Sequence, residues 1–85
     1  MKPRKLLEGI LAGSLNVSFR DFRRLVEAFG FRLSRVRGSH YIFIHPRVPE
    51  LVNIQEVGRK AKPYQIRQFL KLVEEYNLQL ESDDE

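Results

Sequence analysis

The stretch RGSHYIFIHP, residues 37–46, joins a turn signal to a strand signal. Gly38 and Ser39 favour a turn, the aromatic and β-branched run after them favours a strand, and Pro46 ends that run. The pattern predicts a hairpin turn that leads into a strand, with His40 at the strand's first position. Because the unperturbed pKa of imidazole lies near neutrality, a histidine at such an edge can exchange protons with a substrate. The alternative is a surface histidine that merely follows a turn.

Residues on both sides of this stretch extend the sheet. Residues 31–37 alternate between apolar and polar side chains as a strand does, and Val36, which breaks the alternation, predicts a bulge or an edge position. Residues 41–44 are apolar on both faces, which fits a central strand covered on both sides or a strand whose second face a partner covers. Two prolines within residues 46–50 predict a loop, and residues 51–54 predict a short third strand.

Three helices complete the expected order. Pro3 suits the first turn of a helix whose apolar side chains recur at helical spacing. Ser18 is a good N-cap for a second helix, which Gly30 can close, and the aromatic stripe between them predicts a core-facing side. Pro63 opens the last helix, and Asn77 can end it. The order predicts an α+β fold, a three-stranded antiparallel meander with its helices on one face.

Composition bounds the class of protein. A chain of 85 residues makes one domain with a small core, and the absence of cysteine excludes disulfides and thiolate metal sites. A cytoplasmic location is the default for a chain without disulfides. No apolar run is long enough to cross a bilayer, so no membrane partner is expected.

Charge is divided unevenly along the chain. The formal net charge is +4, and leaving out the four carboxylates of Glu81, Asp83, Asp84 and Glu85 raises the charge of the remaining body to +8. So basic a domain favours a polyanionic partner, of which RNA or DNA is the commonest, although a charged surface can also serve solubility alone. Residues 79–85 are expected to form a disordered acidic tail.

The side chains exclude several chemistries. The sequence has no phosphate-binding loop and no pair of carboxylates suited to metal binding or glycoside hydrolysis, so neither a metal nor a cofactor is expected. Ser39 and His40 are strand neighbours that point to opposite faces, which argues against a Ser-His-acid triad. His40 and His45 lie about 16 Å apart along a strand and on opposite faces, so they cannot share one phosphate. A nuclease with one histidine would take any second group from a nearby side chain: Arg37, Tyr41, Lys60 or Lys62.

Three sequence features together suggest a family. Gly38-Ser39-His40 stands at the head of a strand, His45-Pro46 follows, and Lys60-x-x-Pro63 opens a C-terminal helix. In these features the chain resembles the HicA family, the small mRNA interferase toxins of bacterial and archaeal HicAB toxin–antitoxin pairs. The likeness spans residues 18–78. It implies a fold like that of a double-stranded RNA-binding domain, α-β-β-β-α, to which residues 1–17 add an N-terminal helix.

The resemblance also implies an activity. In that family His40 would be the single catalytic residue of a metal-independent endoribonuclease that cleaves mRNA. A neutral imidazole can accept the proton of a ribose 2′-hydroxyl, which then attacks the adjacent phosphate, and cations can stabilise the charge that develops. Gly38 and Ser39 would shape the turn that presents His40. The RNA-binding residues expected from the resemblance, position and charge are Arg37, Gly38, Ser39, Lys60, Lys62 and Arg67.

A HicB-like antitoxin is the protein partner that the resemblance implies, because HicB covers the active-site face of such toxins. Exposed side chains of Ile42 and Ile44 would suit that partner, whereas burial within the monomer is the alternative. Residues 1–17 could mediate a homodimer, or could fold over the His40 edge and put the activity in doubt. A non-catalytic RNA-binding module and a pure protein-interaction domain are the competing functions; only the first of these predicts salt-dependent RNA binding without cleavage.

Overall fold

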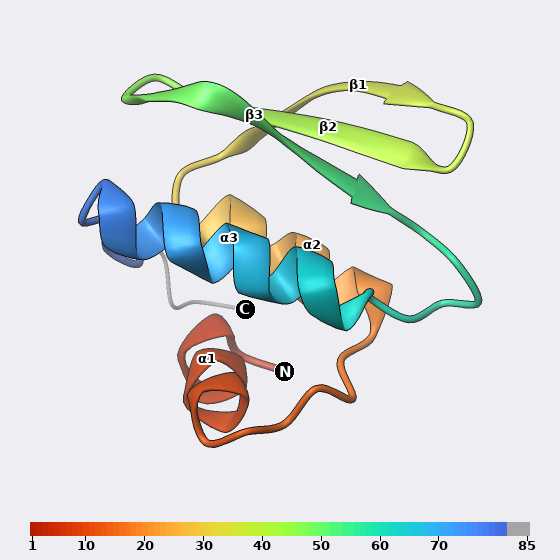
Figure 1. Cartoon of the computed structure of the whole chain (residues 1–85), viewed down its shortest axis with the longest axis vertical. Coiled ribbons are helices and arrows are strands. Elements are labelled where there is room, and N and C mark those ends of the chain that lie inside the picture. Colours follow the sequence, from red (N-terminus) through yellow and green to blue (C-terminus); the bar gives the residue numbers. More distant parts are fainter. Residues whose placement is uncertain (82–85) are drawn as a thin grey trace.

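The computed structural model describes residues 1–81, which form two helices, three strands and a last helix in the expected order. The elements are α1 (Pro3–Leu11), α2 (Phe19–Ala28), β1 (Arg32–Arg37), β2 (His40–His45), β3 (Val48–Gln55) and α3 (Pro63–Glu75). The strands form one antiparallel sheet in the order β1-β2-β3. Helices α2 and α3 cover one face of the sheet, and α1 lies beneath them as a third layer (Figure 1). The α+β fold like that of a double-stranded RNA-binding domain, with an extra N-terminal helix, is confirmed.

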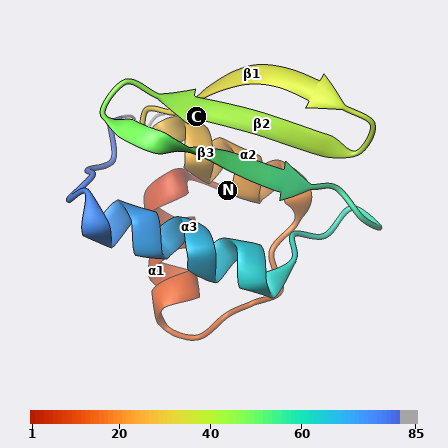
Figure 2. The same cartoon turned by 45° about the horizontal axis from the view of Figure 1, so that its top comes forward.

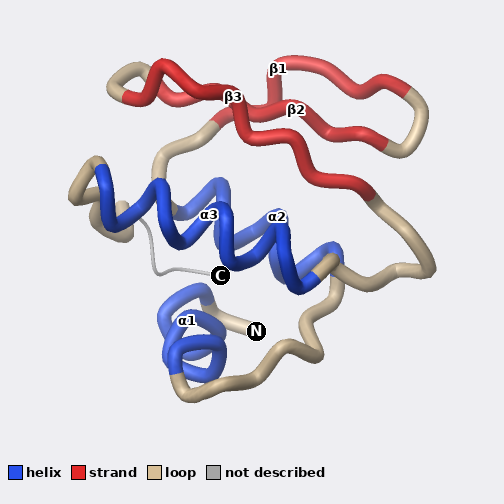
Figure 3. The backbone as a smooth tube through the Cα atoms, viewed as in Figure 1, coloured by secondary structure: helices blue, strands red, loops and turns tan. Residues whose placement is uncertain are grey.

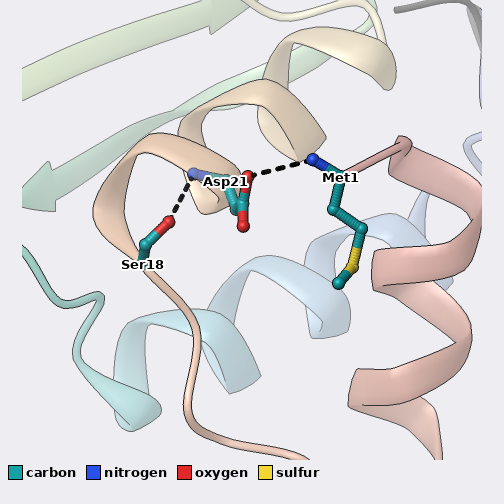
Figure 4. Close-up of polar contacts among 3 residues, drawn as sticks. All are labelled: Met1, Ser18 and Asp21. Carbon is teal, nitrogen blue, oxygen red and sulfur yellow. Dashed lines mark hydrogen bonds and ion pairs between the residues drawn. The ribbon is translucent and has the colours of Figure 1, made fainter.

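Helix α2 begins and ends where the sequence indicates. The Ser18 hydroxyl accepts a 3.0 Å hydrogen bond from the backbone N–H of Asp21, which satisfies one of the free amides of the first turn (Figure 4). Gly30 follows the helix with φ +96°, a conformation that glycine adopts without strain. The N-terminal ammonium of Met1 lies 3.7 Å from the Asp21 carboxylate and joins the start of α1 to the start of α2.

The core lies between the sheet and the α2–α3 layer. Phe69 of α3 is at its centre, because its ring packs edge to face against Phe22, Phe29 and Phe31 with centroids 5.5–5.8 Å apart. Phe43 closes the sheet side and is fully buried. The predicted aromatic stripe of α2 is therefore core, as expected, and offers no exposed platform for stacking bases.

Strand β1 contains a bulge and lies at the edge of the sheet, so both features predicted from the broken alternation at Val36 are present. Leu33 pairs with Phe43 and Arg35 pairs with Ile42, so Ser34 is an extra residue on the β1 side. Without the bulge Arg35 would share the face of Leu33, which points toward the helices, because side chains alternate along a strand. The bulge instead places Arg35 on the face opposite the helices.

The prediction of a loop over residues 46–50 is wrong. Only Pro46 and Arg47 form the turn, His45 pairs with Val48, and β3 runs from Val48 to Gln55. Pro49 fits within this strand because β3 is an edge strand, where one side of the backbone needs no ladder partner. The loop that joins β3 to α3 follows Gln55 (Figure 3).

Helix α3 holds the free edge of β3 at two points. At one end the buried side-chain amide of Gln65 accepts a 3.0 Å hydrogen bond from the Gln55 N–H and donates a 3.2 Å bond to the Asn53 carbonyl. Gln65 thus occupies the place of a further strand and satisfies edge groups that would otherwise be unpaired. At the other end the Tyr76 hydroxyl donates a 2.7 Å hydrogen bond to Glu50.

The bond between Tyr76 and Glu50 predicts a pH dependence of stability. It raises the pKa of Tyr76 to about 12, from a usual value near 10. Because the folded-state pKa is the higher one, the contribution is complete below pH 10 and is lost as the pH rises toward 12. We expect the gap in urea stability between the native chain and Tyr76→Phe to close over that range. A gap that stays constant would contradict this assignment.

The N-terminal extension does not cover the His40 edge. Leu6 and Ile10 of α1 are buried against the helical layer, and α1 lies on the side of α2 and α3 that faces away from the sheet (Figure 2). The expectation of a disordered acidic tail concerned residues 79–85. Of these, Leu80 packs against the core and the Glu81 N–H donates to the Ala28 carbonyl, while residues 82–85 lie outside the described part. Within residues 1–81, no helix combines the length and apolar character that spanning a bilayer requires.

Candidate active site on the open face of the sheet

His40 begins β2 directly after the two-residue turn of Gly38 and Ser39. Gly38 has φ +59°, which the first central position of this kind of hairpin turn demands. Tyr41 and Phe43 point toward the helices, since Tyr41 contacts Phe19 and Phe43 is fully buried. The alternation of the strand therefore puts the half-exposed His40 on the opposite face, which none of the helices within residues 1–81 covers.

A cross-strand hydrogen bond orients the His40 ring. Nδ1 of His40 lies 3.0 Å from the side-chain oxygen Oδ1 of Asn53 on β3. An amide oxygen can only accept a hydrogen bond, so Nδ1 carries the proton in this arrangement. In the neutral ring Nε2 then keeps its lone pair, and it makes no hydrogen bond within residues 1–81. The ring is set to take up a proton at Nε2.

Lys62 is the cation that hydrogen bonds connect to this edge. Its ammonium donates a 2.7 Å hydrogen bond to the side-chain oxygen of Gln55, and the amide nitrogen of Gln55 donates a 3.3 Å bond to the Ser39 hydroxyl. Gln55 is also the direct register partner of His40. The chain of bonds from Lys62 to the turn thus passes beside His40, and the Glu56 N–H closes the same corner by donating to the Ser39 carbonyl.

A row of exposed arginines runs along β1 on the face of His40. Arg37 pairs with His40, Arg35 with Ile42 and Arg32 with Ile44, and all three arginines are exposed. Sequence reasoning singled out Arg37 only. Arg32 and Arg35 were missed because their common face depends on the bulge at Ser34.

Two of the predicted RNA-binding cations lie elsewhere. The Lys60 ammonium donates a 2.5 Å hydrogen bond to the side-chain oxygen of Asn16, in the segment before α2. Arg67 lines a pocket of about 620 Å³ between α1 and α3, together with Lys71. The structure thus brings Arg37, Ser39 and Lys62 to His40 and leaves Arg67 on the side of α3 that faces α1.

His45 belongs to the core and not to the open face. Only 6% of its surface is exposed, its ring contacts Phe31 at 4.9 Å between centroids, and its Nδ1 accepts a hydrogen bond from the Arg47 N–H. Its Nε2 lies 3.9 Å from the Glu81 carboxylate. The inference that the two histidines point to opposite faces is confirmed. Within residues 1–81, no cluster of three or more His, Asp or Glu side chains is arranged to hold a metal ion.

The apolar side chains of the open face differ in exposure. Ile42, in the middle of the sheet, is 7% exposed, whereas Ile44 is 37% exposed and Leu51 of β3 is 57% exposed. Of the two alternatives for these isoleucines, burial within the monomer applies to Ile42 and an exposed side chain applies to Ile44. An exposed apolar patch of Ile44 and Leu51 lies level with Arg32, at the end of the sheet opposite the Gly38 turn.

Residues 19–74 match the family model described as the HicA toxin of bacterial toxin–antitoxin systems. The match covers more than half of the chain and runs from α2 through the sheet into α3, so it includes every residue of the site just described. The chain belongs to the HicA toxin family. No curated protein and no solved structure matches it.

Membership of the HicA family gives the chain a biological role. It is the toxin component of a toxin–antitoxin pair, and its partner is a HicB antitoxin. Helix α1 lies before the matched residues. The boundaries expected for that domain, residues 18–78, stay a prediction.

Proposed function

We propose that this HicA protein is an endoribonuclease that cleaves mRNA with His40 as its one catalytic histidine and without a metal ion. The observation that carries the proposal is the His40 ring itself. Asn53 occupies Nδ1, Nε2 is free of hydrogen bonds within residues 1–81, and the face on which the ring lies is open and basic.

The reaction starts at the ribose. Nε2 of neutral His40 removes the proton of a 2′-hydroxyl, and the 2′-oxygen attacks the adjacent phosphorus. The bond from phosphorus to the 5′-oxygen of the next nucleotide breaks, and that oxygen takes up a proton from water. His40 then returns the proton on Nε2 to the solvent, so no net proton is released. The products are a 2′,3′-cyclic phosphate and a 5′-hydroxyl. DNA lacks the 2′-hydroxyl and is not a substrate.

Cations beside His40 supply the electrostatic part of catalysis. Lys62, which Gln55 holds, and Arg37, which pairs with His40, are placed to stabilise negative charge on the phosphate that reacts. Arg35 and Arg32 continue the positive charge along β1 and neutralise phosphates further along the RNA. Gly38 and Ser39 contribute by holding the turn that presents the ring.

The HicB antitoxin acts on the same face in this proposal. A partner that covers the arginine row and the Ile44–Leu51 patch excludes RNA from His40, and the apolar patch gives it the contact area that RNA phosphates do not use. Inhibition then follows from steric exclusion, with no change in the toxin's own fold.

Cleavage of a defined RNA by the purified chain tests the activity. We expect EDTA to leave the rate unchanged, since no step uses a metal ion. A substrate with 2′-deoxyribose at the cleaved nucleotide should resist cleavage, while the same substitution one nucleotide away should not. Salt-dependent binding of RNA without any cleavage would replace the proposal by that of a non-catalytic RNA-binding module.

A further inference from the structure

We infer that Asn53 is a positioning residue for catalysis, which fixes the orientation of the His40 ring and keeps its proton on Nδ1. The inference rests on the proposed function of His40 and adds a residue to it. Asn53 has no feature that distinguishes it in sequence from a solvent-facing strand residue.

The register of the sheet places Asn53 diagonally across from His40. His40 pairs with Gln55 and Ile42 pairs with Asn53, so Asn53 and His40 are diagonal neighbours on the same face of an antiparallel pair. Their side chains meet at 3.0 Å between Oδ1 and Nδ1. A shift of β3 by one residue would carry Asn53 to the helix-covered face and break the contact.

An acceptor at Nδ1 suits both states of the catalytic ring. In the neutral ring it holds the proton on Nδ1 and leaves Nε2 as the base. When Nε2 has taken a proton from the substrate, Nδ1 is still a donor, and the same hydrogen bond persists. The ring therefore does not need to turn during the reaction, which is the advantage of a preorganised contact.

The backbone of Asn53 is fixed from the other side. The backbone carbonyl of Asn53 accepts a 3.2 Å hydrogen bond from the side-chain amide of buried Gln65. Two residues further along β3, the Gln55 N–H donates to the oxygen of that same Gln65 amide. Helix α3 thus fixes the position of the β3 backbone at the residue whose side chain contacts His40. The Asn53 side chain is thus carried by a strand that α3 holds, and not by a loop.

Two substitutions of Asn53 test the inference by activity. We expect Asn53→Ala to lower kcat for RNA cleavage by about 10–100-fold, with a smaller change in KM, because in this inference Asn53 acts through the His40 ring. Asn53→Asp keeps the acceptor but adds a negative charge that favours imidazolium. In the pH–rate profile of Asn53→Asp, the acidic limb should therefore lie about 0.5–1 pH unit higher than in that of the native chain. Gln79→Glu, which makes the same change of charge beside the pocket at α1, should leave the limb in place.

A measurement of the ring separates this inference from the proposed function. Nitrogen chemical shifts of His40 report the tautomer whether or not the protein cleaves RNA. We expect the proton on Nδ1 in the native chain at a pH where the ring is neutral, and a loss of that preference in Asn53→Ala. A native ring protonated on Nε2, or an Asn53→Ala variant with native kcat and an unchanged pH profile, would overturn the inference. Absence of cleavage by the native chain would instead overturn the proposed function.

Discussion

His40→Ala is expected to lower the rate of RNA cleavage by about 10²–10⁴-fold, which is the range that a general base contributes. Expression of this variant should no longer inhibit growth. The fold should be retained, because the His40 ring lies half exposed on the open face and its hydrogen bond to Asn53 is an exposed one. The circular dichroism spectrum should therefore be unchanged, and the free energy of unfolding in urea should change by less than about 1 kcal/mol.

The second histidine provides the matched control. His45→Phe keeps an aromatic ring against Phe31 in the core and removes the other imidazole of the chain. We expect its rate of cleavage per folded molecule to equal that of the native chain. Native-like toxicity of His40→Ala, or an equal loss of activity in both variants, would rule out His40 as the catalytic base.

Gln65→Leu is expected to lower the free energy of unfolding by about 2–4 kcal/mol. Leucine fills the same buried space but leaves two part-buried groups, the Gln55 N–H and the Asn53 carbonyl, without partners. An unpaired group costs up to about 1–3 kcal/mol when it is shielded from water. That is a large part of the roughly 5–15 kcal/mol by which a typical domain is stable. Urea unfolding measures it, with exposed Gln68→Leu as the control, for which we expect less than about 0.5 kcal/mol.

A second variant at the same position separates the hydrogen bonds from packing. Gln65→Glu can accept from the Gln55 N–H but, when ionised, faces the Asn53 carbonyl with a negative charge. Burial and that carbonyl raise the folded-state pKa of the new carboxyl above its unfolded value of about 4.3. The variant should therefore approach native stability below about pH 4 and lose stability as the pH rises. A pH-independent deficit would mean that packing alone explains the effect of Gln65.

The sequence predicted the parts of this fold that depend on local chemistry. Ser18 caps α2 and Gly30 ends it, since capping needs only neighbouring residues. Gly38 marked the turn that places His40 at the start of β2. The start of β3 was missed because Pro49 is typical of a loop, and only the position of β3 at the sheet edge makes it tolerable there.

The partners of His40 were harder to predict. Asn53 and Gln55 alternate along β3 on the face of His40, a signal that was present in the sequence but is also typical of any solvent-facing strand. Lys60 and Lys62 could not be distinguished by charge. They separate in the structure because Lys60 follows a tight turn and reaches back to Asn16, whereas Lys62 begins α3 and reaches Gln55.

The bulge at Ser34 also bears on how this chain tolerates changes of length. Loss of one codon within a strand normally inverts every side chain beyond it, and a polar face is then driven into the core. A deletion of Ser34 would remove the residue that has no register partner on β2. Arg35 and Arg37 would then stay on the solvent side. The gene for this chain can therefore lose one codon at this position while the positive charge of the outer surface is preserved.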